Sequence, residues 1–236
     1  MRHHFWIALA ALTTGGGALP PASAAQREAV ASPTRPRGLT ETVAEALQPS
    51  SEAALQMSEW VTASENNGGL PFIVIDKFAA AVFVFDADGE FLGETPALLG
   101  VAIGDESTPG IGERELSEMG PAEKTTPAGR FAAHIGAARG GHRVLWVDYP
   151  LSVALHPVVT RNRRERRLQR LRSQTPEDNR ITFGCINVPA RFYTNQIGPL
   201  FREAGGIVYI LPEITPVEEV FPNFRFRATS RAMLSR

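Results

Sequence analysis

The segment Thr182-Phe183-Gly184-Cys185-Ile186-Asn187 contains the only cysteine of this 236-residue chain. A lone cysteine forms no disulfide within its own chain, so Cys185 is either a reactive thiol or a small buried hydrophobic residue. Gly184 leaves room for a substrate carbonyl to approach the backbone, because it carries no side chain. Consecutive amides beside the thiol can donate hydrogen bonds to the oxyanion that develops during acyl transfer. Residue identity alone leaves both interpretations of Cys185 open.

A reactive thiol needs a base, and the chain has five histidines, two of them in its first four residues. His156 ends the apolar run 151–155 and precedes Pro157, which predicts a buried strand that delivers a polar residue at its end. Its imidazole would take the thiol proton and leave a nucleophilic thiolate. The pairing needs proximity in space rather than in sequence. His134, within an expected strand, and His142, in an expected turn, are the competing bases, and we favour His156.

A third segment, Lys124-Thr125-Thr126-Pro127-Ala128-Gly129-Arg130-Phe131, combines a Thr-Pro turn with a glycine and an aromatic strand start. Alone it indicates only a turn. Followed by Leu155-His156 and then by the Cys185 segment, it resembles the L,D-transpeptidase (YkuD-type) catalytic domain. That family has a Thr-Pro-x-Gly-x-Phe segment, then a histidine, then a Ser/Thr-x-Gly-Cys-x-Arg/Asn signature. The resemblance covers about residues 70–212.

This resemblance implies a mainly β fold, an L,D-transpeptidase-like β-sandwich with peripheral helices and the cysteine on the loop after a late strand. It implies that Cys185 is the acylated nucleophile and that His156 is its general base. The backbone amides of Phe183, Gly184 and Cys185 would form the oxyanion hole. The candidates for binding substrate or ordering the site are Thr182, Asn187, Trp146 and Tyr149, the last two as core and rim residues.

The substrates implied by the resemblance are peptidoglycan stem peptides. The thiolate would attack the carbonyl of an L-centre followed by a D-residue, and an amine acceptor would resolve the thioester. Resolution by water would instead make the chain an L,D-carboxypeptidase or hydrolase. Two other classes stay open, namely a non-catalytic cell-wall-binding protein on this fold and an unrelated secreted cysteine peptidase. No metal or organic cofactor is implied.

The N-terminus is typical of a secretory signal, expected over residues 1–24. Arg2 precedes a short apolar core, and Ala22-Ser23-Ala24 fits a cleavage site. We therefore expect export to the periplasm or cell wall. The apolar stretch is too short to cross a bilayer, so no stable membrane span is expected. A formal net charge of -1 gives no reason to expect a nucleic-acid partner.

The rest of the chain divides by composition and periodicity. Residues 25–69 are expected to hold a flexible leader and two helices, capped by Thr40 and Ser51, whose docking is left open. The catalytic domain is expected over residues 70–212 and a C-terminal tail over 213–236. Asn187 is expected to cap a helix that has Pro189 in its first turn and runs towards Ala204. Expected strands cover residues 72–75, 81–85, 90–92, 98–103, 129–135, 143–149, 152–156 and 207–211.

Seven arginines lie between positions 161 and 172, with Glu165 as the one acidic residue among them. Such a run is commonly a solvated helix face or loop, and we favour that interpretation. A lid that attracts carboxylates is the sharper alternative. Nucleic-acid binding is the weakest, because no aromatic residues alternate with the arginines.

Overall fold

The computed structural model describes residues 50–138 and 140–227. Within these ranges the fold is mainly β with short peripheral helices, as predicted. The expected secretory signal and the expected helix after Thr40 lie outside them. No helix in the same ranges is both long and apolar enough to cross a membrane.

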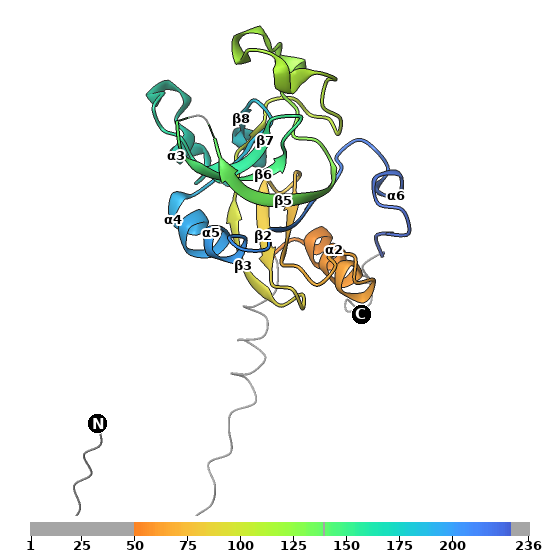
Figure 1. The fold of residues 1–236 in the computed structure, drawn as a ribbon. Coiled ribbons are helices and arrows are strands. Elements are labelled where there is room, and N and C mark those ends of the chain that lie inside the picture. The colour runs from red at the N-terminus through yellow and green to blue at the C-terminus, as the bar shows by residue number, and fades with distance from the viewer. Residues whose placement is uncertain (1–49, 139, 228–236) are drawn as a thin grey trace, which may run out of the picture. The chain divides into compact units, whose positions relative to one another are not determined.

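Eight strands form one sheet in the order β3-β2-β1-β10-β5-β6-β7-β9, and β4 and β8 form a separate parallel pair (Figure 1). Within the large sheet the neighbours are antiparallel except in two pairs, β1 with β10 and β7 with β9. The strands are β1 (Phe72–Asp76), β2 (Ala81–Phe85), β3 (Phe91–Pro96), β4 (Leu99–Gly100), β5 (Gly129–Ala137), β6 (Arg143–Asp148), β7 (Val153–Pro157), β8 (Arg180–Thr182), β9 (Ile186–Val188) and β10 (Gly206–Ile210).

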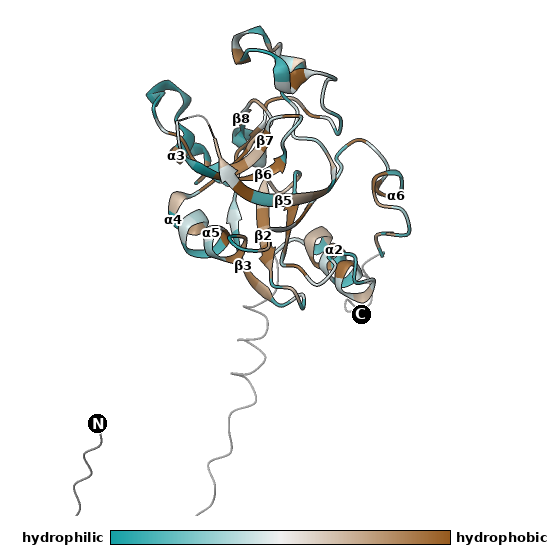
Figure 2. Ribbon diagram, in the orientation of Figure 1, coloured by the Kyte–Doolittle hydropathy of each residue, from teal (hydrophilic) through white to brown (hydrophobic). Residues whose placement is uncertain are grey.

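The central strands β1, β2 and β10 are apolar along their length because both of their faces are covered. In β1, Ile73 and Ile75 enter one hydrophobic cluster, and Phe72 and Val74 enter a second. Figure 2 shows the apolar character of β2, which lies between β3 and β1 in the sheet. The period-2 alternation of a strand therefore divides the core into two layers.

The second cluster is completed by segments from both ends of the described chain. Helix α2 (Glu52–Ala63) starts at Ser51, whose Oγ accepts a hydrogen bond from the Ala54 amide at 3.2 Å. Met57 of α2 packs in this cluster together with Phe221 and Phe224, which follow α6 (Val217–Val220). The sequence did not settle whether the helix after Ser51 docks on the domain. In the structure α2 packs on the sheet, and so does the part of the expected tail that contains Phe221 and Phe224.

A fully buried lysine joins the end of β1 to this C-terminal segment. Lys77 Nζ contacts Asp105 Oδ1 at 2.7 Å and the Gly104 carbonyl at 2.6 Å. The Asp105 carboxylate also accepts the amides of Glu213, Ile214 and Thr215 at 2.6–2.8 Å. Glu213 lies 3.4 Å from Lys77 Nζ and pairs with Arg180 of β8. The cluster ties four separate parts of the chain together.

Two predictions about local structure are wrong. Asn187 does not cap a helix, because it lies in β9 and Pro189 is the N-cap residue instead. The strand expected over 98–103 is reduced to β4, since its residues pair in turn with Asn187, β8 and Thr125. The helices after Pro189 are α4 (Ala190–Phe192), the π-helical segment η6 (Tyr193–Ile197) and α5 (Gly198–Leu200).

The other short helices lie between the strands. The 3-10 turns are η1 (Ile111–Glu113), η2 (Leu116–Glu118), η3 (Pro121–Glu123), η4 (Arg163–Glu165) and η5 (Pro176–Asn179), and α3 covers Arg167–Arg170.

Candidate active site

Cys185 lies in the tight turn between β8 and β9. The buried Thr182 hydroxyl closes this turn, since it donates to the Cys185 carbonyl at 2.6 Å and accepts the Gly184 amide at 3.2 Å. Gly184 has φ +121°, and a Cβ added there would lie 2.7 Å from the Thr125 carbonyl oxygen. Only glycine fits both the backbone angle and this close approach. The turn is therefore built by its neighbours before any substrate binds.

The Thr-Pro segment that the sequence singled out supports this turn from behind. The fully buried Thr126 hydroxyl donates to the Gly184 carbonyl at 2.9 Å and accepts the Gly100 amide at 2.9 Å. Lys124 Nζ lies 4.1 Å from the centroid of the Phe183 ring, within cation–π range. Two sequence segments that are 58 positions apart thus act as one structural unit.

His156 occupies the end of β7, where strand alternation separates it from the core. Leu155 points into the core, and His156 lies on the opposite face. The parallel neighbour β9 places Asn187 directly beside it in register. His156 Nδ1 lies 2.8 Å from the Pro157 carbonyl oxygen, and Nε2 lies 3.0 Å from Asn187 Nδ2. Both ring nitrogens therefore have partners within the protein.

Cys185 and His156 line the same pocket, whose volume is about 550 Å³. Its wall also includes Trp146, and Arg143 and Arg161 add positive charge. A second pocket of about 440 Å³ shares the Trp146 wall with the first and is lined by Glu113 and Tyr149 as well.

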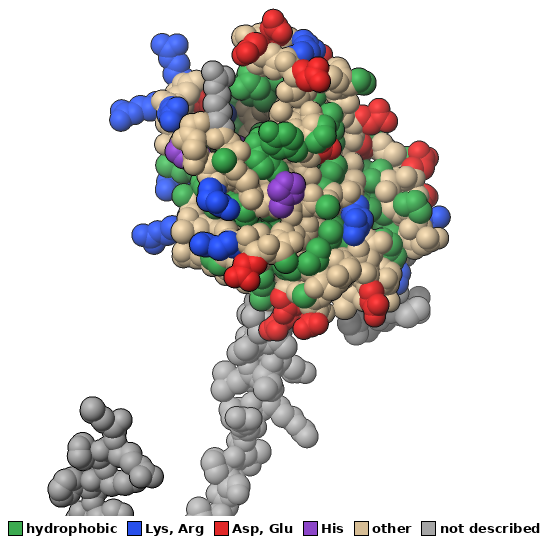
Figure 3. Space-filling view, in the orientation of Figure 1, with side chains coloured by type: hydrophobic (Ala, Val, Ile, Leu, Met, Phe, Trp, Pro, Cys, Tyr) green, Lys and Arg blue, Asp and Glu red, His purple; other side chains and the backbone are tan. Residues whose placement is uncertain are grey.

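The surface around these pockets carries charge of both signs. In Figure 3 basic side chains gather at the upper left, over the segment that contains α3, and acidic side chains gather at the top, over residues 111–123. Arg161, from the arginine run, lines the thiol pocket, and Glu113, from residues 111–123, lines the second pocket. The two pockets thus offer opposite charges to a ligand that spans both.

The thiol and the imidazole do not form a hydrogen bond with each other in the described part of the chain. Cys185 Sγ lies 3.5 Å from the Ser152 carbonyl oxygen instead. Burial raises the pKa of the Cys185 thiol, although the Ala154 backbone and the charge of Arg167 act in the opposite direction. Burial also lowers the pKa of His156; the Pro157 hydrogen bond opposes that change and Arg167 adds to it. At neutral pH the resting pair is therefore a thiol and a neutral imidazole.

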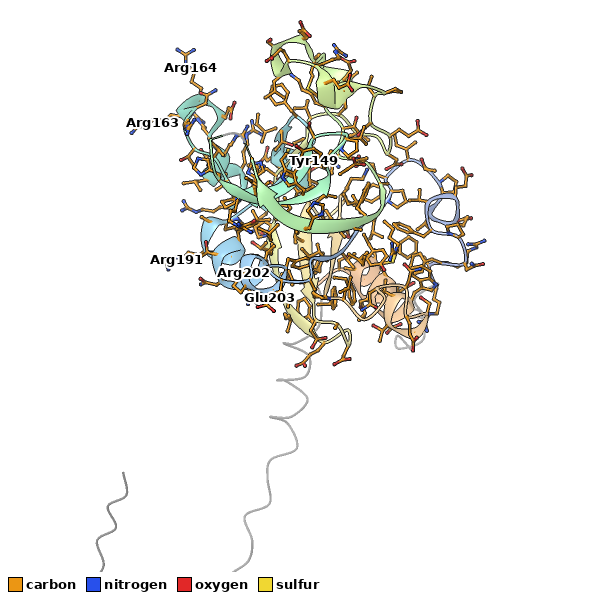
Figure 4. The ribbon with its side chains drawn as sticks, viewed as in Figure 1. Tyr149, Arg163, Arg164, Arg191, Arg202 and Glu203 are labelled. Atoms are coloured by element: carbon orange, nitrogen blue, oxygen red, sulfur yellow. The ribbon has the colours of Figure 1, made fainter. Side chains whose placement is uncertain are left out.

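The remaining predicted site residues lie at or near the pockets. Trp146 Nε1 donates to the Ala137 carbonyl at 3.4 Å, and its ring meets that of Tyr149 edge-on at 4.9 Å. Tyr149 is exposed, and Figure 4 labels it near the middle of the molecule. His142 lines the thiol pocket, whereas His134 is exposed on β5 opposite Trp146.

Of the predicted oxyanion donors, the Gly184 amide is engaged by Thr182 Oγ1 in this structure. Neither the Phe183 nor the Cys185 amide has a hydrogen-bond partner among the described residues. Sequence reasoning missed the supporting roles of Ser152 and Thr126, and it did not single out Arg167, whose Nη1 donates to Asn187 Oδ1 at 2.7 Å. Only the arginine run drew attention to this last residue.

Metal ligands do not come together in the part of the chain that the structure describes: no group of three or more His, Cys, Asp or Glu side chains is close enough to hold an ion.

No protein-family model and no curated protein matches the chain. Among solved structures, it is similar to the LD transpeptidase LdtMt1 in complex with imipenem, at 16% identity and a TM-score of 0.35, over 59% of this chain and 58% of that one. The L,D-transpeptidase catalytic domain from E. faecium matches at 17% identity and 0.33, over 59% and 95%. The L,D-transpeptidase from Mycobacterium smegmatis matches at 16% and 0.31, over 59% and 58%.

The chain thus spans less than two thirds of the length of LdtMt1 and of the Mycobacterium smegmatis protein. At such identities and TM-scores the likeness says nothing about activity.

Proposed function

We propose that this chain is an exported cysteine acyltransferase that carries out L,D-transpeptidation on peptidoglycan stem peptides. The observation that carries the proposal is that Cys185 and His156 line one pocket, while the Nδ1 contact with the Pro157 carbonyl leaves Nε2 as the proton-accepting nitrogen. The substrate class rests on the sequence resemblance of the Thr-Pro segment, the histidine and the cysteine turn. Export rests on the N-terminal signal pattern.

In the proposed reaction the thiol proton moves to His156 Nε2 as Sγ attacks the carbonyl of the L-centre. Nε2 first exchanges its contact with Asn187 for the thiol, because a single lone pair serves both. The tetrahedral oxyanion is stabilised by the Phe183 and Cys185 amides. The intermediate collapses to a thioester, and the D-residue leaves as an amine that takes the proton from the imidazolium. An acceptor amine then attacks the thioester and gives a proton to His156, which passes it to the departing Cys185 thiolate as the new amide forms.

The charges around the two pockets support a zwitterionic peptide substrate. Arg143 and Arg161 line the thiol pocket, where they would attract the carboxylates of a stem peptide. Glu113 lines the neighbouring pocket, where it would attract an ammonium group such as that of an acceptor. Attraction of this kind acts mainly on the encounter with substrate.

The test is mass spectrometry of the full chain incubated with purified sacculi and an amine acceptor. We expect a covalent adduct on Cys185, a released D-amino acid and a cross-linked product. Cys185→Ala should abolish all three. His156→Gln should slow adduct formation about a hundredfold or more, as expected for loss of a positioned base. His134→Gln is the matched control, since that exposed histidine lies on β5, and it should leave the rate unchanged.

Four outcomes would contradict the proposal. Turnover by Cys185→Ala would exclude the thiol as nucleophile. Equal loss in the His134 and His156 variants would exclude a specific base. Reaction with all-L peptides alone would indicate a different class of cysteine peptidase, and a released D-amino acid without cross-linked product would indicate a carboxypeptidase.

A further inference from the structure

A line of polar contacts runs from the arginine run to the candidate base. Glu165 Oε2 accepts from Arg167 Nε at 2.5 Å, and Arg167 Nη1 donates to Asn187 Oδ1 at 2.7 Å. Asn187 Nδ2 then meets His156 Nε2 at 3.0 Å, and His156 Nδ1 meets the Pro157 carbonyl at 2.8 Å. The Arg167 side chain is 13% exposed and Asn187 is 1% exposed, so water competes little for these contacts.

The donor and acceptor chemistry of these groups fixes their orientation. A guanidinium only donates hydrogen bonds, so the atom of Asn187 that faces Arg167 is its carbonyl oxygen. The amide nitrogen of Asn187 therefore faces His156, and because it also only donates, Nε2 has to accept. The single ring proton of neutral His156 then lies on Nδ1, where the Pro157 carbonyl accepts it.

We infer that Arg167 is a positioning residue that acts through Asn187 to hold His156 as the neutral tautomer with its proton on Nδ1 and its lone pair on Nε2. The consequence for turnover rests on the proposed function, whereas the effect on the imidazole itself does not. Glu165 fixes the guanidinium from the other side, so residues 165–167, where η4 meets α3, serve the base rather than only the solvent.

The same arrangement disfavours the imidazolium. A protonated ring carries a hydrogen on each nitrogen, and its Nε2–H would then face the donating amide of Asn187. Without Arg167 the side-chain amide of Asn187 is free to flip by 180°. Its carbonyl oxygen would then accept a hydrogen bond from that Nε2–H. Both hydrogens of the imidazolium would then have acceptors, one on Asn187 and one on Pro157. Loss of Arg167 should thus raise the pKa of His156, in the same direction as loss of its positive charge.

Other charged groups near His156 do not supply this effect. Arg143, Arg161 and His142 line the same pocket as His156, as does the Cys185 thiol, and no carboxylate lies among the described residues of that lining. Glu165 is the acidic residue in the line, and it is paired with Arg167. Arg167 is the cation that contacts the partner of the base directly.

The arginine run also supplies a matched control. Figure 4 shows Arg163 and Arg164 projecting outward at the far end of the segment, away from the sheet. Arg164 is exposed, and its backbone amide contacts Asn162. Arg164→Met removes the same charge from the same segment and leaves the line of contacts intact.

The experiment is nuclear magnetic resonance of the full chain with 15N-labelled histidine, because nitrogen shifts distinguish the two neutral tautomers and the imidazolium. His156→Gln assigns the signal. In the wild type we expect the Nδ1–H tautomer over the neutral pH range. In Arg167→Met we expect a His156 pKa higher by about one unit or more and a mixture of tautomers. Arg167→Lys keeps one donor and the charge and should restore most of the wild-type behaviour, while Arg164→Met should match the wild type.

Turnover gives a second readout that a merely structural role would not move. The acid limb of the pH–rate profile of Arg167→Met should shift to higher pH, so that activity lost at pH 6 returns at pH 8. An Arg167→Met protein whose His156 tautomer and pKa equal those of the wild type overturns the inference even if sacculi are turned over. Absence of turnover by the wild type, together with a raised His156 pKa in Arg167→Met, would overturn the proposed function and leave the inference standing.

A second variant covers the case in which Arg167→Met does not fold. Asn187→Asp keeps the partner of Arg167 but offers only acceptors to Nε2, so it should raise the pKa of His156 and favour the Nε2–H tautomer. An unchanged His156 pKa in this variant also overturns the inference.

Discussion

At the scale of single residues, Gly184 is the position on which the geometry of the nucleophile depends most directly. Its φ of +121° is rarely adopted by other residues, and the Thr125 carbonyl lies 2.7 Å from where a Cβ would be. Gly184→Ala should lower the free energy of unfolding by at least about 1–3 kcal/mol through backbone strain. Because the strain falls on the turn of Cys185, the rate of thiol alkylation should change with it. Chemical denaturation and iodoacetamide labelling measure the two effects.

Gly68 provides the control for this prediction. It also has a positive φ, of +61°, but nothing lies within 4 Å of its would-be Cβ. Gly68→Ala should therefore lose stability by about 1 kcal/mol and leave the alkylation rate of Cys185 unchanged. If both variants affect alkylation alike, the close approach of Thr125 to Gly184 has no special role.

The two reacting side chains rest in their neutral forms. Burial raises the pKa of Cys185 and lowers that of His156, so both shifts oppose a preformed thiolate–imidazolium pair. The proton has to move as the carbonyl is attacked, and the developing oxyanion then compensates for the charge that is created. This differs from a thiol activated before substrate arrives.

At the scale of elements, the sequence predicted most strands because their apolar runs are continuous. Both faces of β1, β2 and β10 are buried, and the runs 72–75, 81–85 and 207–211 end at turn residues. Residue type and sequence context also identified Cys185 as the candidate nucleophile and His156 as the candidate base. It did not predict that Asn187 lies beside His156, because the parallel register of β7 and β9 is a tertiary property.

Arg167 shows the same limit. Seven arginines in one segment are indistinguishable by composition. Arg167 turns towards Asn187, whereas Arg163 and Arg164 point outward (Figure 4). The αL conformation of Arg166, with φ 50°, separates the turn η4 from α3, and no pattern of residue types predicts it.

The link between the Thr-Pro segment and the cysteine turn is also testable. Thr126→Val keeps the shape of the side chain but removes the hydroxyl that joins the Gly100 amide to the Gly184 carbonyl. Two buried backbone groups would lose a partner, which should cost about 1–3 kcal/mol for each group left unsatisfied. Thr126→Ser keeps the hydroxyl and should retain most of the stability. Thermal unfolding of the two variants beside the wild type measures the difference, and equal stabilities would contradict the link.

At the scale of the whole molecule, the buried cluster around Lys77 holds distant segments together. It joins the end of β1 to Asp105 and to the backbone after Pro212, and Phe221 and Phe224 of that same C-terminal segment pack in the second cluster. Burial raises the pKa of Asp105. The hydrogen bonds from Lys77 and three backbone amides together lower it by more, so the pKa lies well below its ordinary value. The folded state therefore favours the ionised carboxylate.

This shift predicts how stability depends on acid. Since the folded pKa of Asp105 lies below the unfolded value of about 3.9, its contribution is complete above that pH and is lost as the pH falls towards the folded pKa. Asp105→Asn should reduce stability at pH 7 by roughly 3–5 kcal/mol, because Lys77 loses a buried partner. The variant should also lose less further stability than the wild type between about pH 4 and pH 2. Urea unfolding across that range measures both effects.

The exposed pair of Glu59 and Arg227 separates the effect of burial from that of charge alone. Their side chains are 48% and 74% exposed, so Glu59→Gln should change stability by no more than about 1 kcal/mol at any of these pH values. Both variants remove one carboxylate that contacts a cation, and both carboxylates also bind the C-terminal segment, Asp105 through the amides of residues 213–215 and Glu59 through Arg227. If the stability of Asp105→Asn fell with pH in the same way as that of the wild type, the cluster would stabilise the fold by packing alone. A large loss of stability with a flattened acid limb requires the ionised carboxylate of Asp105 itself.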